Sequence, residues 1–194
     1  MFSERKTLSP EYIQEVYSKS KLLYSKNDIE AALDRMAIEI SLRVADKNPI
    51  FLCVVLGGIV TLGNLLPRLD FPLELDYIHL TRYGDKCSGD SEITWKAKPS
   101  NDLRGRTVVV VDDILDEGLT LAEVIKYCKE CGAKDVLSAV LLNKEKKRLD
   151  RGTESADIVG LEVGGEHYVI GYGLDYKGYL RNVPGIYAVS PEHY

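Results

Sequence analysis

Runs of apolar residues separated by short polar segments divide the chain, and four of these runs are continuous rather than alternating. A short continuous apolar run bounded by turn residues is typical of a strand that is buried on both faces. We therefore expect strands of a mostly parallel sheet at residues 50–56, 73–80, 108–114 and 136–142.

Helical patterns precede these strands and lie between them. Ser9 followed by Pro10 is typical of a capping residue with proline at the first helical position. Asn27, with Glu30 three residues later, predicts the start of a second helix. Further helices are expected near 58–68 and over about 119–130, whereas residues 82–104 form a long polar segment without apolar periodicity.

The alternation of strands with helices predicts one α/β domain over residues 1–194, with a Rossmann-like, mostly parallel central sheet flanked by helices. From Ile158 onward the chain predicts short strands joined by glycine turns. We expect the N-terminal segment and residues of about 158–194 to form a small β-rich hood over the sheet. In such sheets ligands bind at the carboxyl ends of the strands, so functional residues are expected there.

The charge balance limits the classes of function. The chain of 194 residues has 25 Lys and Arg against 30 Asp and Glu, a net charge of -5. A protein that mainly binds nucleic acid usually carries a basic surface, so this balance argues against that class. The content of 45% hydrophobic and 28% charged residues is typical of a globular protein.

Cysteine usage and the N-terminus favour a cytoplasmic protein. The start of the chain lacks an apolar signal core, and the four cysteines are scattered: Cys53, Cys87, Cys128 and Cys131. Cys128 and Cys131 form one Cys-x-x-Cys pair without a second pair or a nearby histidine, so we interpret them as two thiols on a surface helix. The uncharged stretch 48–67 contains three glycines, and a buried strand, a turn and a helix explain it better than a membrane span.

The stretch VVVVDDILDEGLT, residues 108–120, combines two opposite chemical requirements. Asp112 and Asp113 suit a metal ion or the hydroxyl groups of a sugar. The turn and helix start at 117–121 suit an anion, because free backbone N–H groups point outward there. A phosphorylated sugar with a divalent metal satisfies both, whereas helix capping alone would use one carboxylate.

This stretch resembles the motif that binds 5-phosphoribosyl-1-diphosphate (PRPP) in type I phosphoribosyltransferases. The variable residue of the motif is Asp116 here. That residue is similar to the one in 6-oxopurine enzymes, whereas adenine-specific members carry alanine and orotate-specific members threonine. The resemblance to the hypoxanthine-guanine phosphoribosyltransferases extends over about 46–190.

The resemblance implies a PRPP site built from separate segments of the chain. It comprises Leu56, Gly57, Arg82, Tyr83, Asp112, Asp113, Asp116, Glu117, Gly118, Leu119, Thr120 and Arg181. Relatives often have Lys or Arg where Leu56 stands, and a cis peptide commonly precedes the following glycine. Arg82 replaces a usual serine and is a candidate to supply the charge missing at Leu56. The segment from Arg82 onward is expected to be a lid that shields the reaction from water.

The resemblance also implies a purine site and a Mg²⁺ cofactor. Lys144, Tyr168, Val169 and Asp175 are the expected purine-binding residues, and Asp112, Asp113 and Asp175 the expected metal ligands. A lysine donates hydrogen bonds only, which favours a 6-oxo group over a 6-amino group. Without the resemblance, Lys144 would be assigned to a surface cluster with Lys146, Lys147, Arg148 and Arg151.

These residues indicate a Mg²⁺-dependent transferase of purine salvage, with PRPP and hypoxanthine or guanine as small-molecule substrates and IMP or GMP and diphosphate as products. Asp116 is the expected catalytic residue, taking or holding the N7 proton of the base. No nucleic-acid or membrane partner is expected, and relatives suggest a homodimer or homotetramer. Three alternatives stay open: a sibling enzyme for xanthine, a PRPP-sensing regulator that binds nucleic acid, and a PRPP-binding protein with little turnover.

Glu117 departs from the family pattern, since relatives usually have threonine or serine there. An ionised glutamate cannot donate a hydrogen bond to a phosphate, and its charge would repel one. We therefore expect Glu117 to contribute only its backbone N–H and to turn its carboxylate away, toward a basic neighbour.

Overall fold

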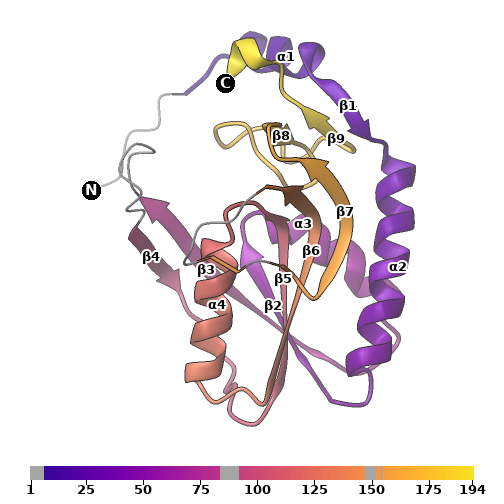
Figure 1. Ribbon diagram of the computed structural model, residues 1–194, viewed down its shortest axis with the longest axis vertical. Helices are drawn as coiled ribbons and strands as arrows, with labels where there is room; N and C mark the ends of the chain where they lie inside the picture. The colour runs from indigo at the N-terminus through magenta and orange to yellow at the C-terminus, as the bar shows by residue number, and fades with distance from the viewer. Residues whose placement is uncertain (1–6, 84–91, 147–151, 154) are drawn as a thin grey trace.

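A six-stranded sheet forms the centre of the computed structural model, which describes residues 7–83, 92–146, 152–153 and 155–194 (Figure 1). The strand order is β4-β3-β2-β5-β6-β7, and only the pairing of β3 with β4 is antiparallel. The strands are β2 (Ile50–Val55), β3 (Glu74–Tyr83), β4 (Glu92–Ala97), β5 (Thr107–Leu115), β6 (Asp135–Glu145) and β7 (Ile158–Gly164). The predicted α/β fold class and its parallel centre are confirmed.

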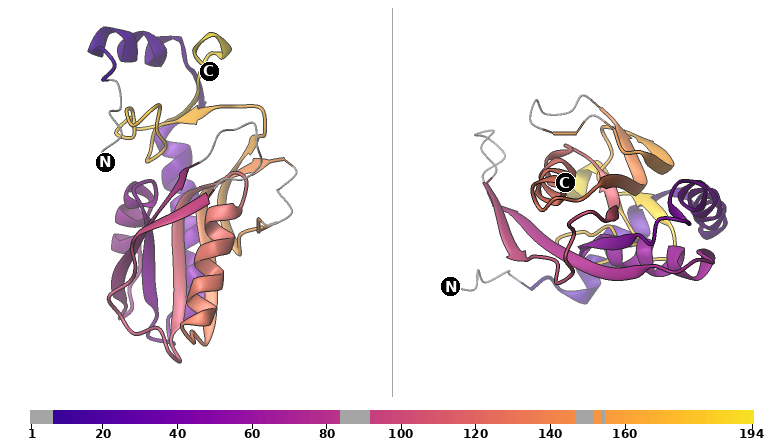
Figure 2. Two further views of the ribbon diagram at one scale, coloured as in Figure 1. Left: turned by 90° about the vertical axis from the view of Figure 1, so that its left-hand side faces the viewer. Right: turned by 90° about the horizontal axis from the view of Figure 1, so that it is seen from below.

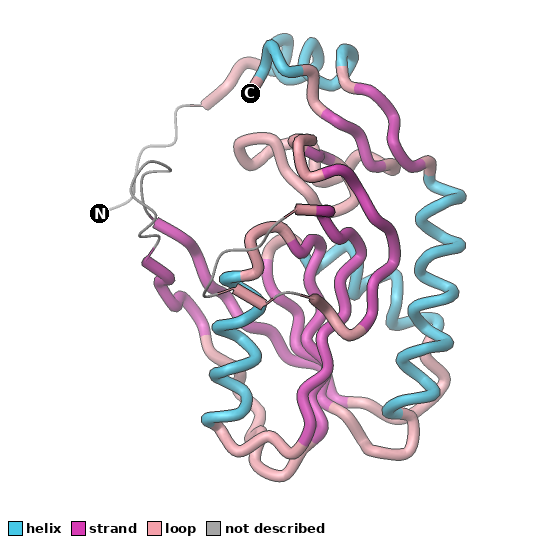
Figure 3. The backbone as a smooth tube through the Cα atoms, in the orientation of Figure 1, coloured by secondary structure: helices cyan, strands magenta, loops and turns pink. Residues whose placement is uncertain are grey.

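Helices cover both faces of this sheet, as Figures 1 and 3 show. The helices α2 (Lys26–Val44) and α3 (Gly58–Leu65) share one core with Phe51 and Val109. The short 3-10 helix η1 (Leu66–Arg68) directly follows α3. The helix α4 (Leu119–Glu130) shares the other core with Leu52 and Val110. Consecutive strand residues therefore point into opposite cores, which explains why these strands are apolar throughout.

A second, three-stranded sheet lies beyond the carboxyl ends of the parallel strands (Figures 1 and 2). Its order is β1-β9-β8, formed by β1 (Lys21–Tyr24), β8 (Val169–Ile170) and β9 (Ile186–Ala188). The helix α1 (Pro10–Lys19) packs on it through a core that includes Val16 and Tyr176. The Tyr176 hydroxyl also donates to the His193 carbonyl of the 3-10 helix η2 (Pro191–His193). This antiparallel sheet corresponds to the predicted hood, with contributions from both ends of the chain.

The structure corrects two element boundaries. The second helix is capped by Ser25 rather than Asn27, because the Ser25 hydroxyl and the Asp28 carboxylate bond each other's backbone N–H groups in a capping box. Within residues 168–174, part of the region predicted to form short strands, only Val169–Ile170 pairs as a strand. The backbone φ angles of Gly171, Tyr172 and Gly173 are positive, which ends the extended conformation there.

The polar segment 82–104 also differs from the expectation of a continuous lid loop. Residues 92–97 form the edge strand β4, and Trp95 packs on Tyr127 of α4 with ring centroids 4.7 Å apart. Trp95 is thus an internal contact rather than a free surface residue. The central part of the expected lid, 84–91, lies outside the described residues.

The stretch 48–67 forms a strand, a turn and a helix, as expected. Within the described ranges of the chain, no helix has the length and apolar character needed to cross a bilayer. Cys128 and Cys131 lie at the end of the expected helix, with Cys128 fully buried in the core under α4 and Cys131 half-buried.

Two leucines on α2 allow a matched test of the core. Leu33 is fully buried, whereas Leu42 is 83% exposed. We expect Leu33→Ala to lower the free energy of unfolding by about 2–5 kcal/mol, because it leaves a cavity beneath the sheet. Leu42→Ala is expected to change it by no more than about 0.5 kcal/mol. Urea denaturation of both variants measures the difference, and equal losses would contradict this assignment of the core.

Candidate active site

The register of the parallel strands brings the candidate residues to one edge of the sheet. Val111 of β5 pairs with Cys53 of β2 and with Ala139 of β6. The chain segments that follow these strands therefore emerge side by side under the hood (Figure 1). A cavity of about 360 Å³ lies between them.

Asp112 and Asp113 lie at the end of β5, and both are buried. The backbone N–H of Asp113 donates to the Asp112 carboxylate at 2.8 Å. Burial and the neighbouring Asp113 charge raise the pKa of Asp112 well above its ordinary value, and burial likewise raises that of Asp113. Two adjacent buried carboxylates of this kind favour a cation or hydroxyl donors in the cavity.

Arg181 connects the hood to this carboxylate pair. Its guanidinium lies 3.8 Å from Asp113 and 2.6 Å from Asp175, and it also donates to the Gly173 carbonyl. Asp175 additionally accepts from the backbone N–H of Gly178 at 2.7 Å. Arg181 therefore partly offsets the charge of Asp113 and lines the cavity on the hood side.

The turn after β2 closes the other side of the cavity. The peptide bond between Val55 and Leu56 is cis, as the family resemblance suggested. A side chain at Gly57 would collide with the Asp113 carboxylate, so glycine is required for this close approach. Gly57 lines the cavity, whereas the Leu56 side chain is 55% exposed and does not.

The turn that precedes α4 exposes backbone N–H groups to the cavity. Gly118 precedes the helix with a φ of 80°, a conformation that favours glycine. The first residues of α4 have no acidic side chain and no side-chain cap, which leaves their N–H groups available to an anion. Glu117 is half-buried and lines the same cavity, and its negative charge acts to raise the pKa of Lys144.

Asp116 lies between Lys144, near the end of β6, and Lys146, which directly follows that strand. Its Oδ2 atom is 3.5 Å from the Lys144 ammonium, and its Oδ1 atom contacts Lys146. Burial alone would raise the pKa of Asp116, but the two ammonium groups outweigh burial and lower it. Burial lowers the pKa of Lys144 despite the attraction of Asp116. The lysine pair thus holds Asp116 in its ionised form.

The hood contributes an aromatic side chain and backbone. Tyr168 lines the cavity, and its hydroxyl donates to the Asp175 carbonyl at 3.1 Å. Its backbone carbonyl accepts from Val189 at 2.8 Å, which ties it to β9. Val169 is buried beside it and also lines the cavity.

Most of the residues expected from the sequence thus line one cavity, and the exceptions are specific. Leu56 is exposed, and the side chains of Arg82 and Tyr83, at the end of β3, lie outside the described part of the structure. Lys146 was assigned to a surface cluster, but it contacts Asp116. In the sequence, only the position of Lys146 directly after the strand β6, two residues beyond Lys144, could have indicated that it lies near Asp116.

The donor set fits the expected Mg²⁺ ion shared with a substrate. Magnesium is usually bound by one or two carboxylates together with phosphate oxygens, and Asp112 and Asp113 supply such carboxylates. Among the residues that the structure describes, no three His, Cys, Asp or Glu side chains converge into a metal cage. The site therefore suits a metal that arrives with a phosphorylated ligand.

The raised pKa of Asp112 predicts a measurable effect on stability. A carboxyl whose pKa is higher in the folded state destabilises that state as the pH rises above its unfolded pKa. We expect Asp112→Asn to stabilise the metal-free protein near pH 7 by about 1 kcal/mol, a rise in Tm of about 2–4 °C. This gain is expected to vanish near pH 3–4, roughly the pKa of the unfolded state.

Asp102→Asn is the matched control, because the pKa of Asp102 is shifted in the opposite direction from that of Asp112. Asp102 is exposed, and the side-chain hydrogen bonds from Arg104 lower its pKa to about 2. Its substitution is expected to give no stabilisation near neutral pH. Thermal unfolding with a chelator present measures both variants, and a destabilised Asp112→Asn at neutral pH would refute the assigned direction.

Comparison with known proteins gives the family. Residues 20–177 match the family described as Phosphoribosyl transferase domain. The hypoxanthine-guanine-xanthine phosphoribosyltransferase of Tritrichomonas foetus is 34% identical, over 86% of this chain and 89% of that protein. The hypoxanthine-guanine phosphoribosyltransferase of Bacillus subtilis is 29% identical, over 90% of this chain and 95% of that protein.

A solved structure agrees with these sequence matches. The hypoxanthine phosphoribosyltransferase of Trypanosoma cruzi, as a mutant with its ternary substrates, superposes with a TM-score of 0.82 at 26% identity. The match covers 92% of this chain and all of the Trypanosoma cruzi chain. With the cavity at the strand ends and the motif at 108–120, these matches show that the chain belongs to the phosphoribosyltransferase family.

Proposed function

We propose that this protein transfers the 5-phosphoribosyl group of PRPP to a 6-oxopurine, giving the purine nucleotide and diphosphate in purine salvage. The observation that carries the proposal is the position of Asp116. It lies in one cavity with the buried Asp112 and Asp113, with the N-terminus of α4, and with Lys144. Relatives at 29–34% identity carry the names of enzymes with this activity.

The phosphorylated sugar would lie along the end of β5. The backbone N–H groups from Glu117 to Thr120 bind the 5-phosphate, because the start of α4 has no competing side-chain cap. Asp112 and Asp113 accept hydrogen bonds from the ribose hydroxyls, which relieves the cost of their burial.

The base would lie between β6 and the hood. Lys144 donates to the 6-oxo group, Tyr168 stacks on the ring, and the carbonyl of Val169 accepts from the edge of the base. The N9 atom attacks the anomeric carbon as the bond to diphosphate breaks, and diphosphate leaves with the electron pair. Asp116 takes the N7 proton in this step, so the ring does not accumulate positive charge.

Diphosphate would leave past the turn after β2. The backbone at Leu56 and Gly57 approaches it closely, and the Arg181 guanidinium, which also pairs with Asp175, donates to it. Asp112, Asp113 and Asp175 would hold Mg²⁺ together with the substrate, and the metal would supply charge neutralisation of the leaving group. The proposal also places Arg82 and Tyr83 in the PRPP site.

Xanthine is a further candidate substrate, since one relative is named for hypoxanthine, guanine and xanthine. Initial rates with these three bases and adenine decide the substrate class. Adenine as the best substrate would refute the role of Lys144.

The proposal also includes a cytoplasmic location. It further includes a homodimer or homotetramer, and the exposed apolar side chains of Ile59, Leu75 and Tyr77 support this assembly.

Replacing Asp116 tests the proposed chemistry. We expect Asp116→Asn to lower kcat with hypoxanthine or guanine by roughly a hundredfold, because the amide cannot accept the N7 proton. Asp46→Asn, an exposed carboxylate at the far end of α2, is the control and should retain wild-type kcat. Steady-state assays with PRPP and Mg²⁺ measure both, and an unaffected Asp116→Asn enzyme would exclude this role.

Glu117 tests the proposed phosphate site. We propose that its carboxylate turns away from the phosphate, although Glu117 lines the cavity and its charge acts to raise the pKa of Lys144. We expect Glu117→Gln to change the KM for PRPP by less than about twofold, because only the backbone N–H at 117 contributes. If the carboxylate faced the phosphate, removal of the repulsion would lower that KM by more than about tenfold.

A further inference from the structure

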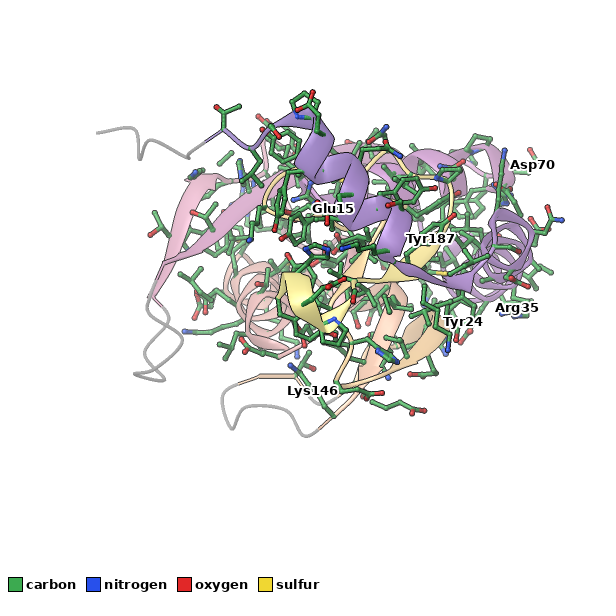
Figure 4. The ribbon with its side chains drawn as sticks, turned by 90° about the horizontal axis from the view of Figure 1, so that it is seen from above. Glu15, Tyr24, Arg35, Asp70, Lys146 and Tyr187 are labelled. Atoms are coloured by element: carbon green, nitrogen blue, oxygen red, sulfur yellow. The ribbon has the colours of Figure 1, made fainter. Side chains whose placement is uncertain are left out.

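Lys146 contacts Asp116, which lines the cavity, and the proposed reaction assigns this lysine no role. It follows β6 directly, and its backbone N–H donates to the Lys144 carbonyl at 2.9 Å (Lys146 is labelled in Figure 4). Its ammonium contacts Asp116 Oδ1, whereas Lys144 lies 3.5 Å from Asp116 Oδ2. The two lysines thus engage different oxygens of one carboxylate.

The contact is shielded more than a typical surface ion pair. The side chain of Lys146 is 30% exposed and that of Asp116 is 32% exposed. By contrast, Lys126 and Glu130 on α4 are 3.9 Å apart with side chains about two-thirds exposed. Partial burial reduces screening by water and salt, so the Lys146 charge acts on Asp116 more strongly than a surface lysine would.

We propose that Lys146 is a positioning residue that holds the Asp116 carboxylate in place and ionised while Lys144 donates to the purine. The inference rests on the proposed function. In that reaction Lys144 has two partners, the 6-oxo group and Asp116. An ammonium that turns toward the base loses part of its contact with the carboxylate, and Lys146 supplies the contact that remains.

The electrostatics of the site agree with this geometry. Burial acts to raise the pKa of Asp116, and the strongest opposing influence is the hydrogen bond from Lys146. Other ionisable side chains also line the cavity, from β5, the turn before α4, and the hood: Asp112, Asp113, Glu117, Tyr168, Asp175 and Arg181. The cation among them is Arg181, whose guanidinium lies beside Asp175 and Asp113, so it does not replace Lys146 at Asp116.

The test compares Lys146→Met, Lys146→Arg and the control Lys126→Met. We expect Lys146→Met to move the acidic limb of the kcat/KM pH profile to higher pH, because Asp116 then takes up its proton more readily. The loss of activity is expected to reach about fivefold on this limb, a small part of what a general base contributes, and to shrink at alkaline pH. Lys146→Arg retains the charge and the wild-type limb, and Lys126→Met leaves the profile unchanged.

A second readout does not require turnover. Carbon-detected NMR follows the Asp116 carboxyl in the unliganded protein, with Asp116→Asn identifying its signal. The titration midpoint is expected at higher pH in Lys146→Met than in the wild type and in Lys126→Met. An unchanged midpoint overturns the inference, as does an acidic limb that moves equally in the control. If no purine is turned over, the proposed function fails, and the NMR titration still decides whether Lys146 holds Asp116 ionised.

Discussion

Because β2, β5 and β6 are parallel and pair residue by residue, the segments that follow them must emerge at one edge of the sheet. That constraint positions the turn at Gly57, the acidic stretch at the end of β5 and Lys144 near the end of β6 around one cavity. The hood then closes the cavity from above, with Arg181 reaching down to Asp113. Every proposed step depends on this shared edge.

The aspartates at the end of β5 and just after it are in opposite electrostatic situations. Asp112 and Asp113 are buried with little compensation, so their pKa values are raised and they favour a cation or sugar hydroxyls. Asp116 is held by two lysines, and its pKa is lowered. Asp112 and Asp113 are therefore suited to bind a cation or sugar hydroxyls. Asp116 is ionised at neutral pH before the reaction, so it is able to accept a proton. This difference in pKa between aspartates that are close in the chain fits a reaction that binds a charged sugar beside a neutral base.

The sequence predicted the parts of this arrangement that depend on local pattern. The apolar run of β5 and the motif after it were both recognisable, and the central strands were found. The strands β1 and β4 were missed, because β1 has only four residues and pairs with β9 far along the chain. β4 is an edge strand within a polar segment. The contact of Lys146 with Asp116 bridges two elements, and no pattern along one segment encodes it.

A crystal structure of this protein with IMP tests the central claim most directly. The account predicts the 5-phosphate on the backbone N–H groups at 117–120 and the ribose hydroxyls on Asp112 and Asp113. It also predicts the base between Lys144 and Tyr168, with N7 facing Asp116. A nucleotide bound outside this cavity, or one with its phosphate on Arg181 and its base away from Lys144, would contradict the account.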